Sequence, residues 1–554
     1  MKKAISILLL LAMVFAVCAC GSTQTAATGS AQVGGDSTGQ SITEYGTQLQ
    51  TTNEKATITE KPEGIQRGTV FTFATAAEIP IYCPWSDNRA SWLYYQIYDN
   101  LLQRHQGNPL DLHPALAESY TVSDDGLEYV FKIREGVTFQ DGEPVNAEAF
   151  IHTIETVTRE RHARYYTKVE SIEATGEYEL TFKLSSPDAN FLVTTCAEPH
   201  LGPVSPKALD AYGPDDNRSA VGIGPFYVES YEPGVGYVLK ATENYYNELK
   251  QPSIETLQIK FLPEESTQIV AFENGEVDCM SFTSANVYSQ LTEDGFPVAA
   301  VKMTAGPMWL NAERVPAFKN AKVREAIAHM IDWDKVNELA FDGLRSIPDS
   351  YIDGPGNYPY DEGAYDYDPE LGKKLIEEAG YKLEDIKFSI MGDFEMETMV
   401  VVIQQILNDN GLVNVSTDII DGATCYGMLK GGQYDSFILS NGYGVTDCMG
   451  CYKMGIVDNP SGAPQPVIWL SKFDDCEDAF NEVLEWYQKA MDSATNEEYV
   501  AACAQITRIC QENYVAAGAN TETRFWAFQN KWSGIYPTAG LSYLDFCYVY
   551  CNEA

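Results

Sequence analysis

Apolar and mostly polar residues alternate from position 127 to position 133, with Leu, Tyr, Phe and Ile at the odd positions. A period of two predicts a β-strand that buries one face. The turn-forming sequence Ser-Asp-Asp-Gly at 123–126 precedes this strand, and Gln-Asp-Gly follows it at 140–142. Asn146 comes next, before apolar residues at 150, 151, 154 and 157, and this spacing predicts a helix that Asn146 caps.

A second helix pattern follows Asn320, because apolar residues recur at 323, 326, 327, 330 and 331. A third begins at Asp368-Pro369, which supply a cap and a first-turn proline, and it ends at Gly380. The chain then continues with a strand at 387–391, a helix at 396–409 and strands at 413–418 and 434–439. This order predicts an α/β domain whose sheet is partly parallel.

The N-terminus has a different pattern. Lys2 and Lys3 precede an apolar run from Ala4 to Val17, and small residues follow the run. This combination predicts a secretory signal peptide over residues 1–19. The run is shorter than the roughly 20 residues that a transmembrane helix needs. We therefore expect an exported protein.

The end of this signal resembles the lipobox of bacterial lipoproteins, with Val17-Cys18-Ala19 directly before Cys20. The resemblance implies that the Cys20 thiol carries a diacylglyceryl group, whose two acyl chains suffice for stable anchoring. Residues 20–65 are rich in Gly, Ser, Thr and Gln, a composition that predicts a flexible linker without a packed core. A plain signal peptide with an incidental cysteine is the alternative.

Charge and composition narrow the classes of partner. The 554 residues include 37 basic and 79 acidic side chains, for a formal net charge of −42. This charge argues against nucleic acid as a partner, and against contact with the membrane beyond the lipid anchor. At about 150 residues per domain, the length predicts three or four domains. The apolar fraction of 45% excludes a wholly disordered chain.

The cysteines leave several possibilities open. Of 13 cysteines, eleven remain once Cys18 is removed with the signal and Cys20 is lipidated. An odd number leaves at least one thiol unpaired, or in an intermolecular disulfide. Cys448 and Cys451 have the C-x-x-C spacing of a local disulfide, a redox pair or half of a metal site, and they also fit a pair of inert thiols.

No local motif points to catalysis, to a metal or to a cofactor. The chain lacks H-E-x-x-H, G-x-S-x-G and the P-loop pattern, and no G-x-G-x-x-G opens a helix after a strand. Its six histidines lie singly, so a three-histidine site would require histidines that are far apart in the sequence to come together in the fold. No local pair stands out among the 79 acids as the two carboxylates of a hydrolase. We predict a protein that is not an enzyme.

Several short motifs occur in an order known from one protein family. They lie at 97–102 (I-Y-D-N-L-L), 114–147 (ending V-T-F-Q-D-G-E-P-V-N-A), 222–226 (G-I-G-P-F), 274–278 (N-G-E-V-D), 322–332 and 367–381. On these residues the chain resembles the extracellular solute-binding proteins of family 5, the dipeptide- and oligopeptide-binding group of ABC importers. The resemblance extends from about residue 66 to the C-terminus.

Most of these motif residues have a structural interpretation. Gly224-Pro225 predicts the start of a strand at a place where two backbones approach closely. On the helix after Asn320, the apolar residues belong to the core, and Arg324 faces the opposite side, towards a carboxylate partner. These residues therefore indicate the fold and leave the ligand undetermined.

The resemblance implies an α/β, two-lobed periplasmic-binding-protein-like fold (type II, cluster C-like), with an extra subdomain inserted in the first lobe. The first lobe would comprise residues 66–100, 217–308 and 516–554, the inserted subdomain 101–216 and the second lobe 309–515. Ligand would bind between the lobes and stabilise the closed form. The closed monomer would deliver it to ABC transporter permease subunits at the extracytoplasmic face of the bacterial cell membrane.

Family members that bind peptides often carry a tryptophan and an aspartate soon after a strand that ends in an aromatic residue and Asp. The resemblance implies that this aspartate pairs with the peptide α-ammonium, a charge-assisted bond. Here Tyr434-Asp435 supplies the strand, and Asp447 is the candidate ammonium ligand. Tyr443 is the nearest candidate aromatic contact. The alternatives are a solvated loop acid for Asp447 and ordinary packing for Tyr443.

Four further residues are candidate ligand contacts under the same resemblance. Trp309 and Asn311 lie near the expected hinge crossing, and Trp85 and Trp92 lie in the expected first-lobe cleft loop. Core packing is the alternative for each tryptophan. The predicted ligand is a peptide, with oligosaccharides, opines, haem and nickel complexes as alternatives within the family. A tethered hydrolase and an adhesin are the alternatives of another class.

Overall fold

The structure is a computed structural model of the chain, and it describes residues 49–51, 69–86, 91–105, 108–351, 358–393, 396–438, 470–535, 537 and 544–552. All described residues belong to one compact unit within residues 37–554. The predicted signal peptide and Cys20 lie outside the described residues.

The largest element is a mixed sheet of 11 strands. Its strands are β1 (Leu49–Thr51), β2 (Val70–Thr75), β9 (Phe226–Glu232), β10 (Gly236–Ala241), β11 (Thr256–Phe261), β12 (Cys279–Phe282), β13 (Val298–Leu310), β14 (Phe388–Asp393), β15 (Val415–Ile420), β16 (Ser436–Ile438) and β17 (Ala516–Phe528). They follow the order β15-β14-β16-β13-β17-β12-β2-β11-β10-β9, and β1 pairs with β13 off this path.

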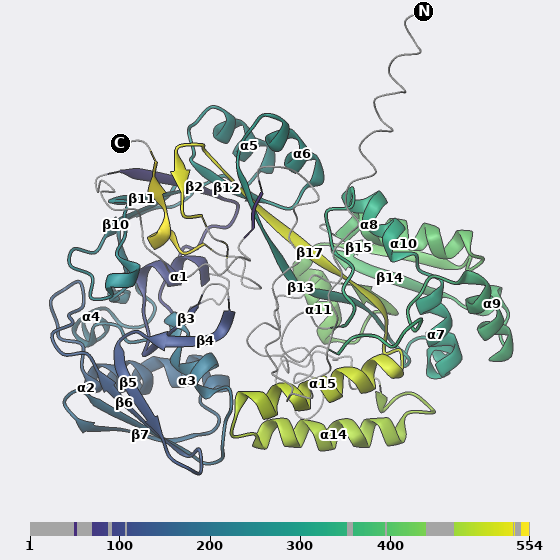
Figure 1. Cartoon of the computed structure of the whole chain (residues 1–554), viewed down its shortest axis with the longest axis horizontal. Coiled ribbons are helices and arrows are strands. Elements are labelled where there is room, and N and C mark those ends of the chain that lie inside the picture. Colours follow the sequence, from purple (N-terminus) through teal and green to yellow (C-terminus); the bar gives the residue numbers. More distant parts are fainter. Residues whose placement is uncertain are drawn as a thin grey trace, which may run out of the picture. The chain divides into compact units, whose positions relative to one another are not determined.

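Two long antiparallel strands join the halves of this sheet. Figure 1 shows β13 and β17 side by side, and their register runs from Val298 opposite Ala527 to Trp309 opposite Ala516. At one end β13 also pairs with β16, and at the other end β17 also pairs with β12. Each strand therefore contributes to both halves of the sheet.

The remaining described strands form smaller sheets. A four-stranded antiparallel sheet has the order β5-β6-β8-β7, and two-stranded sheets pair β3 with β4 and β18 with β19. The strands are β3 (Leu102–His105), β4 (Asn108–Pro114), β5 (Ala117–Val122), β6 (Glu128–Ile133), β7 (Val169–Gly176), β8 (Glu179–Leu184), β18 (Trp532–Ser533) and β19 (Tyr550–Cys551). Strand β6 is the one predicted from the alternation at 127–133, and this prediction is confirmed.

Helices pack around these sheets. They are α1 (Ser91–Ile97), α2 (Ala147–Thr153), α3 (Arg159–Arg161), α4 (Pro206–Tyr212), α5 (Glu265–Glu273), α6 (Ala285–Glu293), α7 (Ala321–His329), α8 (Trp333–Phe341), α9 (Pro369–Glu378), α10 (Glu397–Asp409), α11 (Gly422–Lys430), α14 (Glu477–Asp492) and α15 (Asn496–Glu512). No helix among the described residues is long and apolar enough to cross a membrane.

The predicted capping residues cap their helices. Asn146 Oδ1 accepts a hydrogen bond from Ala149 N at 3.0 Å, at the start of α2. Asn320 and Asp368 do the same for α7 and α9, accepting from the backbone amides of Lys322 and Leu371 at 3.0 and 2.9 Å. These contacts satisfy amides that have no partner inside the helix, which is why the local sequence predicts them well.

The predicted partly parallel α/β arrangement is confirmed. Strand β14 pairs in parallel with both β15 and β16, and α10 connects β14 to β15. The bounds differ by about two residues from those predicted, since β15 begins at Val415 rather than at 413. Val413 is 63% exposed and lies in the turn before the strand.

Gly224 lies where two backbones meet, as the sequence predicts. A Cβ atom at this position would lie 2.4 Å from the carbonyl carbon of Ile97 and 2.7 Å from the Tyr98 amide nitrogen. Strand β9 begins two residues later, at Phe226. Only glycine fits this approach without a shift of the backbone.

Three residues within the range of the predicted linker are described, and they form a strand. Strand β1, within the linker range of 20–65, pairs in parallel with residues 298–300 of β13. Strand β16 covers the edge of β13 only at 308–310, so the edge at 298–300 is open to another strand. An unpaired edge offers free amide and carbonyl groups, and β1 satisfies some of them.

The buried apolar residues form four clusters. One lies within residues 308–517, and another within residues 101–223. The other two combine residues from 71–303 with residues from 525–549. Strands β13 and β17 contribute to clusters on both sides, whereas residues 520–524 in the middle of β17 belong to none of the four.

Candidate functional site

The candidate ammonium ligand, the aromatic residue near it and the C-x-x-C pair lie outside the described residues. Asp447, Tyr443, Cys448 and Cys451 all fall within 439–469, which the structure does not describe. Their predicted roles stay predictions. Of the other predicted ligand contacts, Trp309, Asn311, Trp85 and Trp92 are described, and each can be placed.

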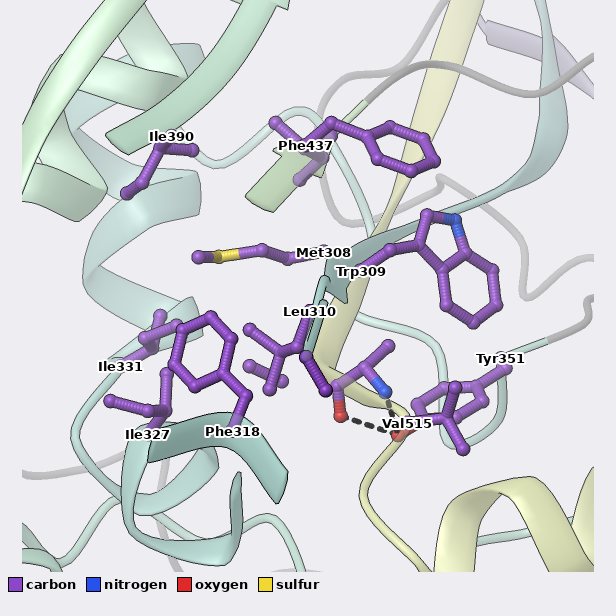
Figure 2. Packing of buried hydrophobic residues seen from close by; sticks show 14 of the residues in the cluster. Met308, Trp309, Leu310, Phe318, Ile327, Ile331, Tyr351, Ile390, Phe437 and Val515 are labelled. Atoms are coloured by element: carbon purple, nitrogen blue, oxygen red, sulfur yellow. Dashed lines mark hydrogen bonds between the residues drawn. The ribbon is translucent and has the colours of Figure 1, made fainter. Parts of the chain in front are cut away.

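Trp309 belongs to the core of its half of the sheet. It is 2% exposed, and its ring meets the ring of Tyr351 edge to face, with centroids 5.7 Å apart. Figure 2 shows Trp309 and Tyr351 on one side of β13 and Met308 on the other, as the alternation of side chains along a strand requires. The indole packs as core residues do, and its role in ligand binding stays a prediction.

Asn311 has no hydrogen-bonding capacity left for a ligand in this arrangement. Its Nδ2 donates to the backbone oxygens of Tyr434 and Gly432 at 2.7 and 3.4 Å. Its Oδ1 accepts from the amides of Glu313 and Arg314 at 3.0 and 3.3 Å. The side chain therefore ties the end of β13 to the start of β16, and a ligand contact would have to replace one of these bonds.

Trp85 and Trp92 differ in their surroundings. Trp85 is 3% exposed, and its Nε1 donates to Pro214 O at 2.6 Å. Trp92 is partly buried on α1 and packs at centroid distances of 6.4 and 6.3 Å from Phe73 and Tyr237. Trp92 therefore keeps some accessible surface, whereas Trp85 has almost none.

The structure brings together a group of polar residues that the sequence reasoning missed. Asn520, Glu522 and Arg524 alternate along one face of β17, and Arg345 reaches them from the loop after α8; we call these four residues the β17 polar cluster. Arg345 Nη1 donates to Asn520 Oδ1 at 3.1 Å, and Arg345 Nη2 lies 3.9 Å from Glu522 Oε2. Arg524 Nη2 donates to Glu522 Oε1 at 3.0 Å.

Three of the four residues in the cluster are largely buried, whereas the Arg524 side chain is 32% exposed. Asn520 and Glu522 are 2% and 3% exposed, and the Arg345 side chain is 8% exposed. Asn337 on α8 bonds both the backbone amide and the backbone carbonyl of Arg345, at 3.0 and 2.6 Å. The sequence signal was the run N-T-E-T-R at 520–524 inside an otherwise apolar strand, since charges in a buried strand need partners.

A second buried ionic group lies beside α1. Glu198 accepts a short hydrogen bond from Arg104 and lies 3.5 Å from His200 Nδ1. Burial alone would raise the pKa of Glu198, but Arg104 and His200 outweigh it and hold the pKa at about 2. The rings of His200 and His162 lie 5.2 Å apart, and burial and then His200 lower the pKa of His162 to about 4.

A third group fastens the C-terminal segment. Lys250 Nζ lies 2.8 Å from Asp545 Oδ2, with both side chains at least nine-tenths buried. Nearby, Asp99 accepts from the hydroxyls of Tyr245 and Tyr246, and burial raises its pKa. Among the described residues, no group of three or more His, Cys, Asp and Glu side chains is arranged to hold a metal ion.

This architecture is that of a two-lobed binding protein, and comparison with solved structures supports it. NikA from Brucella suis, in complex with Fe(III)-EDTA, superimposes with a TM-score of 0.75 at 20% identity, covering 87% of this chain and 100% of NikA. The periplasmic binding protein DppA from Helicobacter pylori, in complex with the peptide STSA, gives a TM-score of 0.66 at 21% identity, covering 88% and 99%. The predicted fold class is confirmed.

The family follows from the sequence. The model of the bacterial extracellular solute-binding proteins, family 5, middle region, matches residues 111–455, and the chain belongs to this family. The glutathione-binding protein GsiB of Escherichia coli O1:K1 / APEC is 28% identical over 282 residues, which are 49% of this chain and 54% of GsiB. The chain thus spans about half the length of the curated relatives that it matches. The predicted family is confirmed.

Proposed function

We propose that this protein is the lipid-anchored solute-binding component of an ABC importer and that its ligand is a peptide. Family membership over residues 111–455 is the observation that carries the proposal. A relative named for binding glutathione and a structural neighbour holding a tetrapeptide both favour a peptide ligand. The protein captures its ligand and hands it to permease subunits without making or breaking a bond.

The proposed lobes meet across β13 and β17. The first lobe comprises 66–100, 217–308 and 516–554, the second lobe 309–515, and the inserted subdomain 101–216. A buried apolar cluster within 308–517 and another within 101–223 support this division. A third cluster consists mainly of first-lobe residues and also includes Val157, Val204 and Leu209 of the inserted subdomain. Ligand then stabilises the closed form through contacts with both lobes.

A thermal-shift screen of the purified protein tests the ligand class. The panel contains pools of short peptides, sugars, opines, haem and metal chelates. A ligand at 100 times its dissociation constant adds about 2.7 kcal/mol of stability, which is readily detected. A shift with peptides that Asp447→Ala abolishes, and that the exposed control Asp474→Ala retains, supports both the peptide ligand and the role of Asp447.

Other outcomes of the screen would contradict the peptide ligand or the importer. A shift with sugars, opines, haem or a chelate alone keeps the importer and overturns the peptide ligand. A ligand consumed during incubation indicates the hydrolase alternative, because a binding protein returns its ligand unchanged. No shift with any compound favours the adhesin.

The lipid anchor has its own test. Wild-type protein in a bacterial host should fractionate with the membrane and incorporate a fatty-acid label. Cys20→Ser should abolish the label and release the protein, whereas Cys18→Ser should leave both unchanged, since only the cysteine at the cleavage site is acylated. Membrane retention and label in Cys20→Ser contradict the anchor.

A further inference from the structure

The C-terminal end of α14 meets the proposed inserted subdomain. Lys168 Nζ, directly before β7, donates to Met491 O at 2.6 Å and to Pro187 O at 2.5 Å. Met491 lies in the last turn of α14, where carbonyl oxygens have no partner inside the helix. A lysine at this end also compensates the partial negative charge of the helix dipole. One ammonium group therefore joins two segments that are 323 residues apart in the sequence.

Two further contacts join the same parts of the chain. A Cβ atom at Gly126 would lie 3.9 Å from the Cβ of Ala494, in the turn between α14 and α15. Ala189 is partly buried and packs against the apolar cluster within 308–517. We call this set the α14 contact, and it consists of Gly126, Lys168, Pro187 and Ala189 on one side and Met491 and Ala494 on the other.

The inserted subdomain is also bound to the proposed first lobe. Asn100 Nδ2 donates to the backbone oxygens of Thr195 and Glu198 at 2.8 and 2.9 Å. Trp85 Nε1 donates to Pro214 O at 2.6 Å. An apolar cluster that consists mainly of first-lobe residues includes residues of this subdomain as well. We therefore expect the inserted subdomain to move with the first lobe when the lobes separate.

The α14 contact is separate from the two strands that join the halves of the large sheet. None of its residues belongs to β13 or β17. Strands that run through both halves stay paired while the lobes rotate about them, whereas contacts away from these strands have to break. Opening of the lobes therefore has to break the bond from Lys168 to Met491.

We propose that the α14 contact is a latch that holds the two lobes closed, with Lys168 as the residue that engages the second lobe. The inference rests on the closure of two lobes in the proposed function, and it is independent of the class of ligand. The bond from an ammonium group to a carbonyl oxygen is charge-assisted. Its loss changes the equilibrium between closed and open forms by roughly tenfold. A latch of this strength favours closure and still lets the ligand leave.

A designed disulfide tests the contact itself. The purified protein carries Gly126→Cys and Ala494→Cys, because a Cβ separation of 3.9 Å is that of a disulfide. Oxidised glutathione should form a disulfide between positions 126 and 494, identified by mass spectrometry, and neither single variant should form it. Gly126 has a φ of +69°, which strains a cysteine, so thermal unfolding of the reduced protein first checks that it is folded.

The rate of cross-linking tests the role of Lys168 without any ligand. Because ligand is proposed to stabilise closure, the closed form is the minor one in its absence, and the rate is proportional to its population. Adding Lys168→Met to the double-cysteine protein should slow cross-linking by roughly tenfold. Lys183→Met is the matched control, since Lys183 pairs with Glu173 within the same subdomain, and it should leave the rate unchanged.

Release of a bound peptide gives a second measurement. The probe is the peptide that produces the largest shift in the thermal screen. It leaves only after the lobes open, so Lys168→Met should raise its dissociation rate by roughly tenfold and leave its association rate unchanged. The oxidised double-cysteine protein should release the peptide more slowly than the reduced protein does. A purely structural role of Lys168 would not divide its effect between the two rates in this way.

The outcomes separate the latch from the peptide ligand. Absence of the disulfide in a folded double-cysteine protein overturns the contact, and an unchanged cross-linking rate with Lys168→Met overturns the latch. Neither result affects the peptide ligand. Equal release from the oxidised and reduced proteins also overturns the latch, because the contact then persists while the lobes open. If wild-type protein binds no peptide, the peptide ligand is overturned, and the cross-linking rate alone decides the latch.

Discussion

Arg324 on α7 is fully buried and lies 3.2 Å from Asp475 through its Nη2 atom, although Asp475 itself is 42% exposed in its side chain. The guanidinium also donates to the backbone oxygens of Phe318, Lys319 and Asn513 at 3.1, 3.0 and 2.9 Å. The predicted carboxylate partner of Arg324 is therefore confirmed. The side of the helix on which Arg324 lies is also buried, because residues around 473–476 and 513 cover it.

Arg324→Leu should lower the free energy of unfolding by about 3–5 kcal/mol, because it leaves buried carbonyls unsatisfied. Asp475→Asn should cost only about 1 kcal/mol, since this carboxylate is half-exposed and its bond from the Ala321 amide can persist. Urea unfolding measures both. The neighbouring Asp474→Asn, 77% exposed, is the matched control and should be neutral. A neutral Arg324→Leu would contradict the structure.

Gly224→Ala should destabilise the protein by about 1–3 kcal/mol, because its Cβ would overlap the Ile97 and Tyr98 backbone. Gly427→Ala is the matched control, as Gly427 lies exposed within α11 with nothing within 4 Å of the added Cβ. That substitution should be neutral or stabilise by up to about 1 kcal/mol, through helix propensity. Thermal unfolding of both variants compares them, and equal effects would contradict the close approach at Gly224.

His162 should make stability depend on pH between about 4 and 6.5. Its pKa is lowered to about 4 in the folded protein, by burial and then by His200, so in this range the unfolded chain binds a proton that the folded chain does not. Stability should therefore rise with pH, by up to about 1.4 kcal/mol per pH unit. Besides His200, the groups near the ring are Tyr165, Arg164 and the Pro84 carbonyl.

Urea unfolding at pH 4.5, 5.5 and 6.5 measures this slope. His162→Phe should flatten it, whereas His152→Gln, a change at a partly exposed histidine paired with Asp210, should leave it in place. The same slope in His162→Phe as in wild type would assign the pH dependence to other groups. Glu198 adds a loss of stability only at lower pH, below its unfolded pKa of about 4.3, as the pH falls towards its folded pKa.

Lys250→Met should cost about 3–5 kcal/mol, because it leaves Asp545 buried without its cation. Adding Asp545→Asn should recover part of the lost stability, because it removes the buried carboxylate charge that has lost its cation. The asparagine can also keep the hydrogen bond that Asp545 accepts from the Cys547 amide. Lys132→Met is the control, as its pair with Glu118 is exposed and contributes about 0–1 kcal/mol. Additive effects in the double variant would show that the two residues are not coupled.

Several local features were predicted correctly from the sequence, whereas the contacts that join distant segments were not. Asn146 caps α2 through an amide three residues away, so its role is visible in the local sequence. Asn311 is a candidate ligand contact in the sequence, yet its Nδ2 donates to backbone oxygens more than 120 residues away. The sequence around position 311 does not predict those partners.

The sequence by itself determined the family, the turns, the helix caps and the strand–helix order, because each depends on residues within a few positions of one another or on motifs that match those of the family in type and order. Only the tertiary structure decided that Asn520 meets Arg345, 175 residues away, and that Trp309 packs against Tyr351. The physical reason is that both contacts depend on how the segment after α8, which holds Arg345 and Tyr351, packs on strands far away in the sequence. The alternation of side chains along a strand decides which residues share a face, but it does not decide which distant segment packs on that face.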